Sequence, residues 1–201
     1  MIDSMAKQFE KPKGLLGKLA GTIMYFENRK INKWSIKKLQ IQKKDRILEI
    51  GYGPGYGIKT MITDYPLVEI DGIDLSEKML QEASKRNQKW IQTGKVYLAA
   101  GNVVNFQPGH HYTKVLSVNN YPLWDQPLQS LKHIHTLIDK GGKIVITVQP
   151  REEGSTDDTA RQLGEKIKQD LLQSGFRDPV VSYKKVRPVL TVCVTAEKDK
   201  E

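Results

Sequence analysis

Four glycines alternate with other residues over positions 51–57, directly after a short apolar run at 47–50. A short apolar run bounded by polar residues and glycines is typical of a buried parallel strand. Glycine adopts positive φ without steric cost and lets a ligand approach the backbone closely. Apolar residues at helical spacing follow, so the loop leads into a helix N-terminus, where unpaired N–H groups favour polar or anionic atoms. Residues 45–60 therefore predict the nucleotide-binding corner of a doubly wound α/β domain.

The spacing of these glycines excludes the dehydrogenase pattern G-x-G-x-x-G. Counting from Gly51 places Tyr56 at the third glycine, and counting from Gly53 places Ile58 there. The chain instead has Glu49 two residues before the first glycine, followed by G-x-G-x-G. This pattern resembles motif I of the class I S-adenosylmethionine-dependent methyltransferases of the small-molecule type, in which the acidic residue ends the first strand.

The ends of the next two predicted strands carry polar residues in the order that this resemblance implies. The strand at 67–75 ends at Asp74, whose carboxylate can accept hydrogen bonds from ribose hydroxyls. Asp71 is the rival acid, although it lies inside the strand. The strand Val96–Ala99 leads to Asn102 and Val103, where the family often has an aspartate that binds the adenine amino group. An asparagine oxygen can still accept that hydrogen bond, without the charge.

The fourth predicted strand, Val115–Val118, ends in Asn119-Asn120-Tyr121-Pro122. Because the carboxyl ends of such strands face the cofactor crevice, we expect Asn119, Asn120, Tyr121 and Trp124 near the transferred methyl group. The order of these residues differs from the Asn-Pro-Pro-Tyr motif of enzymes that methylate amide or base nitrogens. The sequence therefore does not indicate an exocyclic-amine nucleic-acid methylase.

The remaining pattern predicts a Rossmann-like doubly wound sheet of seven strands, mostly parallel, with an antiparallel edge strand and N-terminal helices. A helix at 127–139 is followed by a Gly141-Gly142 turn and a fifth strand. A second helix ends before Gly175, and the strands Val180–Tyr183 and Val189–Ala196 read as an antiparallel hairpin at the sheet edge.

The positive charge of the chain is concentrated near its start. The 201 residues carry a net charge of +9, of which residues 1–46 account for +8 and residues 47–201 for +1. Leucines and other apolar residues recur at helical spacing from Leu15 onward, so we expect residues 1–40 to form an amphipathic segment covering the substrate. Residues 41–201 then form the cofactor-binding domain. A basic segment can meet an anionic membrane surface, an acidic substrate or nucleic acid, or simply form a solvated helix face.

The resemblance implies an enzyme that binds S-adenosylmethionine and transfers its methyl group to a small-molecule or lipid-like acceptor. A nucleic-acid or protein methyltransferase and a non-catalytic cofactor-binding module are the alternatives. A polar N-terminus and one cysteine, Cys193, indicate a cytoplasmic protein. We expect no metal site, because His133 and His135 lie two apart on one helix and face different ways.

Three groups of site residues follow from these arguments. The expected cofactor-binding residues are Glu49, Gly51, Tyr52, Gly53, Gly55, Asp74, Leu75, Asn102, Val103 and Asn119. The expected substrate residues are Tyr25, Trp34, Tyr121 and Trp124, with the alternative that they only pack on the sheet. The cofactor is already activated, so no catalytic dyad is required, and Tyr25, Tyr121 and His111 are the candidates for a proton acceptor.

Overall fold

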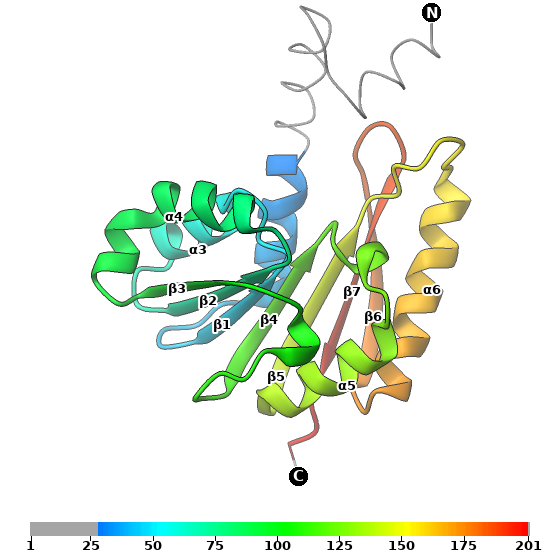
Figure 1. Ribbon diagram of the computed structural model, residues 1–201. Helices are drawn as coiled ribbons and strands as arrows, with labels where there is room; N and C mark the ends of the chain where they lie inside the picture. The colour runs from blue at the N-terminus through cyan, green and yellow to red at the C-terminus, as the bar shows by residue number, and fades with distance from the viewer. Residues whose placement is uncertain (1–27, 201) are drawn as a thin grey trace, which may run out of the picture.

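Seven strands of the computed structural model, which describes residues 28–200, form one sheet in the order β3-β2-β1-β4-β5-β7-β6 (Figure 1). Neighbouring strands from β3 to β5 pair in parallel, and β7 pairs antiparallel with both β5 and β6. The carboxyl ends of the parallel strands therefore meet at one edge, where the loops can form a binding crevice. The strands are β1 Arg46–Ile50, β2 Glu69–Asp74, β3 Val96–Ala100, β4 Tyr112–Val118, β5 Ile138–Val148, β6 Arg177–Lys185 and β7 Leu190–Glu197.

Helices cover both faces of this sheet (Figure 1). Ser76 begins one of them by accepting a hydrogen bond from the backbone N–H of Met79, and Thr156 with Thr159 forms a capping box at the start of another. The helix over residues 28–39 is held to the sheet by a 2.8 Å hydrogen bond from Ser35 to Thr147 on β5. The other helices are α3 Tyr56–Asp64, α4 Glu77–Gln92, α5 Pro127–Leu137 and α6 Asp157–Gln173, with short 3-10 turns η1 Val103–Asn105 and η2 Tyr121–Leu123.

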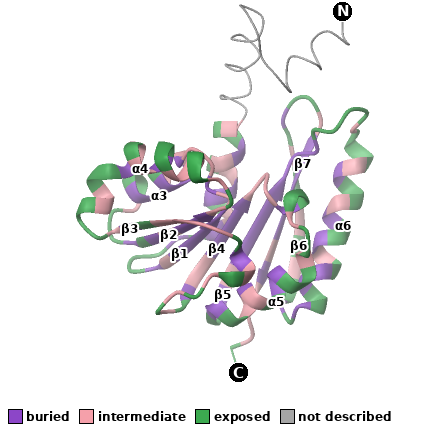
Figure 2. Cartoon of the chain, in the orientation of Figure 1, coloured by how far each residue is buried: buried purple, intermediate pink, exposed green. Residues whose placement is uncertain are grey.

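Alternation along the strands divides the core into two clusters, one on each face of the sheet. Ile47 and Leu48 are adjacent and both fully buried, yet they belong to different clusters. One cluster contains residues of α3 and of the helix over 28–39, and the other contains residues of α5 and α6. Figure 2 shows buried residues concentrated in the strands and exposed residues on the outer faces of the helices. Each fully buried aliphatic side chain stabilises the fold by roughly 1.5–3 kcal/mol.

The predicted fold class is confirmed, with two differences in detail. Helix α5 ends at Leu137 and β5 begins at Ile138, so the helix stops two residues earlier than the sequence pattern indicated. The physical reason is that Ile138 already pairs with Tyr112 on β4, before a register shift that contains Gly141 at φ +72°. The predicted hairpin lies at the sheet edge, and its antiparallel strand β7 is the inner one of the two.

Candidate functional site

A cavity of about 290 Å³ opens at the carboxyl ends of β1, β2 and β3. Its wall combines the glycine loop after β1, the end of β2, the turn η1 and the segment from η2 into α5. It contains five of the ten residues that the sequence assigned to the cofactor: Gly51, Asp74, Leu75, Asn102 and Val103. It also contains Asn120, Leu123 and Trp124, which follow β4. Gly51 of the glycine motif is therefore brought together with residues that follow the neighbouring strands, whereas Glu49, Tyr52, Gly53 and Gly55 do not line this cavity.

The glycine loop adopts a backbone that few side chains would tolerate. Gly51 has φ +72°, and a Cβ there would lie 2.2 Å from Cγ of Asn120. Gly53 has φ +51°, and no atom of the other described residues, apart from its two chain neighbours, lies within 4 Å of the position of its Cβ. Gly51 is thus required by the protein's own packing, whereas the space beside Gly53 is open. Gly55 is the N-cap residue of α3.

Asp74 is held in place by two backbone donors. Its Oδ2 accepts a 2.8 Å hydrogen bond from the N–H of Gly53, and its Oδ1 accepts a 2.9 Å bond from the N–H of Ser76. An ionised carboxylate has about four acceptor positions, so both oxygens can accept further hydrogen bonds from a ligand. Asp74 consequently joins the glycine loop to the end of β2 and presents a fixed acceptor to the cavity.

Glu49 lies buried beneath the first turn of α3, where a Cβ on Gly57 would be 2.2 Å from its Oε1. Burial, and then the charge of Asp74, raises the pKa of Glu49 to about 8, while a backbone hydrogen bond from Ile58 acts in the opposite direction. Oε2 of Glu49 has no hydrogen-bond partner among the described residues. A buried polar atom without a hydrogen-bond partner costs free energy, so a donor group that reached Oε2 would be favoured.

Asn102, Val103 and Leu75 form the part of the wall next to β2 and β3. The side-chain oxygen of Asn102 accepts a 3.0 Å hydrogen bond from the N–H of Val104 and so caps η1. Val103 is buried, and Leu75 is exposed. This combination gives an apolar surface beside a polar amide, which suits a flat heteroaromatic ring.

The segment after β4 divides the first cavity from a second one. Nε1 of Trp124 donates a 2.6 Å hydrogen bond to Oδ1 of Asn120, and both residues line the first cavity. The side chain of Asn119 points to the other side: its Oδ1 accepts a 2.8 Å bond from the N–H of Gln149, which follows β5. Asn119 has φ +52°, a conformation that asparagine tolerates better than most residues. Leu123 lines both cavities, so they share a wall.

The second cavity has a volume of about 500 Å³ and lies beyond the carboxyl ends of β4 and β5, against the first half of α6. Its volume falls within the roughly 300–1,000 Å³ that is usual for small-molecule sites. Its apolar lining residues are Pro122, Leu123, Val148, Pro150 and Leu163, and its polar ones are Asn119, Gln149, Arg151, Glu152, Thr159, Gln162 and Lys166.

Comparison with known proteins identifies the family. The family profile described as "Methyltransferase domain" matches residues 47–142. The chain is 38% identical to the uncharacterized methyltransferase YdaC of Bacillus subtilis over 181 residues, which cover 90% of this chain and 98% of that protein. The chain belongs to the S-adenosylmethionine-dependent methyltransferases.

One further relative is also named as a methyltransferase, and one solved structure shares the fold. Malonyl-[acyl-carrier protein] O-methyltransferase 1 of Ilyobacter polytropus is 26% identical over 132 residues, covering 63% of this chain and 48% of that protein. The crystal structure of the N-methyltransferase NodS from Bradyrhizobium japonicum, in complex with S-adenosyl-l-homocysteine, shares the fold with a TM-score of 0.66 at 16% identity. That match covers 86% of this chain and 87% of NodS.

Several residues that the sequence assigned to the site lie away from both cavities of the methyltransferase. The hydroxyl of Tyr52 donates to the backbone oxygen of Ala99 at 3.0 Å, inside the core. Trp34 packs against the core cluster on the α3 face, with Lys38 and Lys184 each 5.8 Å from the centre of its ring. Tyr25 lies outside the described residues, as do the other apolar residues of the expected N-terminal cover up to Phe26. The described part of that cover, residues 28–40, holds five of its nine basic residues and buries Ile31, Ile36 and Leu39.

Tyr121 belongs to the segment that follows β4. It is buried, and its hydroxyl donates to Oδ2 of Asp170 on α6. Burial, followed by this hydrogen bond and the charge of Asp170, raises the pKa of Tyr121 well above its usual value. A phenol that is already donating to a carboxylate is a poor proton acceptor. The geometry therefore gives Tyr121 a packing role, in which its ring lies 5.2 Å from that of Trp124.

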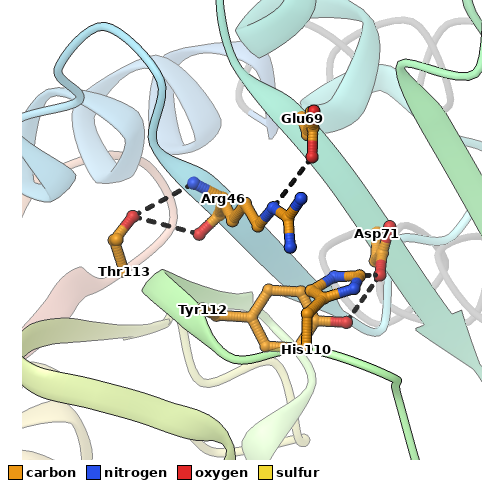
Figure 3. Close-up of polar contacts among 6 residues, drawn as sticks. All are labelled: Arg46, Glu69, Asp71, His110, Tyr112 and Thr113. Carbon is orange, nitrogen blue, oxygen red and sulfur yellow. Dashed lines mark hydrogen bonds and ion pairs between the residues drawn. The ribbon is translucent and has the colours of Figure 1, made fainter.

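Asp71 and His110 lie on the face of the sheet opposite α3 and α4, whereas His111 lies beside the start of β5. Oδ2 of Asp71 accepts a 2.6 Å hydrogen bond from Tyr112 and lies 3.1 Å from Nε2 of His110 (Figure 3). His111 is exposed and lies 3.5 Å from Asp139, just before β4 begins. The seven residues of β4 place His111 roughly 20 Å from the carboxyl end of the strand. None of these three residues lines either cavity.

The sequence did not identify Gln149, Arg151 and Lys166, which line the second cavity. Gln149 and Arg151 come directly after β5, so the rule that ligands bind at strand ends could have pointed to them. Lys166 reaches the cavity because of how α6 packs on the sheet, and no pattern of consecutive residues indicates that packing. Within residues 28–200, no cluster of three or more His, Cys, Asp and Glu could hold a metal ion, and no helix is long and apolar enough to span a membrane.

Proposed function

We propose that this methyltransferase methylates a small molecule, with S-adenosylmethionine in the first cavity and the acceptor in the second. The observation that supports this proposal is the shared wall at Leu123, which separates a cavity lined by five of the ten expected cofactor residues from a larger one lined by Asn119 alone of that set. The bound cofactor supplies a methyl group on a sulfonium, which is already activated for in-line displacement.

Three features of this chain fit that cofactor. The carboxylate of Asp74 can accept from both ribose hydroxyls, as in other nucleotide-binding folds of this type. Leu75 and Val103 offer apolar contact to the adenine, with Asn102 as the polar neighbour. The open space beside Gly53 and the unsatisfied Oε2 of Glu49 fit the methionine end, whose ammonium group is positively charged.

Because the cofactor is already activated, the protein contributes to catalysis mainly by positioning the acceptor and excluding water. Asn119, Asn120 and Leu123 stand between the two cavities, where they can orient the acceptor toward the methyl group. Names of relatives favour a small or acyl acceptor, because one of them acts on malonyl groups carried by a protein. The net charge of +1 over residues 47–201 gives no support to a nucleic-acid acceptor.

The test follows radioactive methyl groups from labelled S-adenosylmethionine into a cell extract that has been separated into small-molecule, nucleic-acid and protein fractions. We expect label in the small-molecule fraction, and none with the variant Asp74→Ala. Label in the nucleic-acid or protein fraction would contradict the proposed acceptor class. Calorimetric binding of S-adenosylmethionine without transfer to any fraction would instead favour a non-catalytic module.

A further inference from the structure

The charges around the second cavity are not equally neutralised. Nζ of Lys166 lies 2.7 Å from Oδ2 of Asp170, which is almost fully buried and also accepts from Tyr121. Glu152 is exposed, and its oxygen accepts from the hydroxyl of Ser155 at 3.4 Å. The lysine charge is therefore compensated within the protein, and the glutamate faces solvent.

Arg151 differs from Lys166 in this respect. Its Nη2 donates a 2.6 Å hydrogen bond to Oδ1 of Asn28, a neutral amide oxygen. Within residues 28–200, no carboxylate forms an ion pair with the guanidinium of Arg151. A guanidinium has five donors in a rigid fork that matches carboxylate and phosphate oxygens. One bond to Asn28 leaves most of these donors available.

The position of Arg151 is fixed by the same contacts that form the cavity. Asn28 begins the described part of the helix over residues 28–39, and its Oδ1 also lies 3.5 Å from Nδ2 of Asn119. Arg151 is two residues beyond Gln149, whose side chain donates to the backbone oxygens of Val186, Arg187 and Val189. The segment after β5 is thus bonded both to the helix over residues 28–39 and to the β6–β7 hairpin, which holds Arg151 in the cavity wall.

An apolar surface lies beside this cation. Val148 is buried at the end of β5, and Leu163 packs against the core from α6, while both line the cavity. A molecule that fills the cavity would place an apolar body on these residues and a polar group near Arg151. A neutral polar group would leave the guanidinium charge uncompensated, so an anionic group is favoured.

We propose that the second cavity binds a methyl acceptor with an apolar body and an anionic oxygen group, carboxylate or phosphate, and that Arg151 holds this anionic group. The inference rests on the proposed function, since it assumes that the second cavity is the acceptor site. It adds the chemical class of the acceptor and the residue that selects it.

The test is calorimetric titration of the full chain, saturated with S-adenosylhomocysteine, with three probes of matched length: octanoate, octyl phosphate and octanamide. We expect at least one anionic probe to bind roughly tenfold more tightly than octanamide, which corresponds to about 1.4 kcal/mol. Arg151→Gln should remove that preference and leave octanamide binding unchanged, while Arg151→Lys should keep part of it. The matched control is Arg161→Gln, which removes an exposed arginine of α6 that pairs with Asp158 outside the cavity.

Equal binding of all three probes, no binding of any probe, or an anion preference that survives Arg151→Gln would overturn the inference. The stronger of the two anionic probes distinguishes a carboxylate from a phosphate acceptor. Gln162→Trp, at an exposed position in the cavity wall, locates the site, because it should weaken binding of every probe. Binding of S-adenosylhomocysteine is measured separately in each variant, so failure of the cofactor assignment is seen independently of failure at Arg151.

Discussion

The two cavities of this methyltransferase are formed in different ways. The first is built mainly by backbone: a glycine loop, two strand ends and the short turn η1 bring its wall together. The second is built mainly by side chains from segments far apart in the sequence, after β4, after β5 and on α6. A cavity formed by backbone requires particular residues at particular spacings. A cavity lined by side chains can be formed by many combinations of residues.

This difference explains why the first cavity tolerates little change and the second can be specific for one acceptor. At Gly51 and Gly53 the backbone has positive φ, which side chains rarely adopt. Around the second cavity, Arg151 and Gln162 are exposed and can be replaced without disturbing the core. We therefore expect the largest effects of substitution on the cofactor side, and the following predictions test that ranking.

The largest effect is expected for Gly53→Ala. Apart from its chain neighbours, no residue between 28 and 200 has an atom within 4 Å of the new Cβ, so a loss of binding beyond that of the control reports a cofactor that lies close to the backbone. We expect the Kd for S-adenosylmethionine to rise on the order of 100-fold, or about 2.7 kcal/mol, in calorimetric titration. The matched control is Gly94→Ala in the turn before β3, which has φ +71° and equally open surroundings. It should suffer the same backbone strain without loss of binding, and equal Kd values for the two variants would contradict the placement of the cofactor.

Glu49, next to the glycine loop, should make the stability of the fold depend on pH. Its pKa of about 8 means that the folded protein keeps a proton which the unfolded chain releases above about pH 4.5. The stability that this proton contributes is present at low pH and is lost as pH rises through 8. Between pH 6 and 8, we expect the free energy of unfolding to fall by about 2 kcal/mol more in the wild type than in Glu49→Gln. Urea unfolding at several pH values measures this, and parallel curves for the two proteins would refute it.

Asp74→Asn should weaken the cofactor about tenfold, because an amide has one acceptor oxygen where the carboxylate has two. The hydrogen bonds from Gly53 and Ser76 already use both carboxylate oxygens, so the amide must also give up one of these. The control, Asp64→Asn, changes an exposed aspartate at the end of α3 and should leave the Kd unchanged. A Kd for Asp74→Asn within twofold of the wild type would show that the ribose lies elsewhere.

The difference between the two cavities also sets how much could be predicted from the sequence. The order of glycines, Asp74 and Asn102 predicted the first cavity because strand ends and tight turns leave signals in consecutive residues. Tyr52 was assigned to the cofactor on the same basis, but its side chain turns into the core under Gly72. Nothing in the neighbouring residues shows which face a loop side chain will occupy. Arg151 and Lys166 line the same cavity only because α6 packs against β6 and β7, which no local pattern encodes.

The smallest effect is expected for Tyr121→Phe. This variant tests whether a buried residue of the segment after β4 takes part in the reaction. Tyr121→Phe removes the hydrogen bond to Asp170, but that carboxylate keeps Lys166 as a partner. We expect the free energy of unfolding to fall by about 1 kcal/mol, while kcat changes by less than roughly twofold. Tyr183→Phe, on β6 and partly exposed, serves as the control for loss of a tyrosine hydroxyl. A large fall in kcat with unchanged stability would make Tyr121 a proton acceptor, and the second cavity would then have to reach its hydroxyl during turnover.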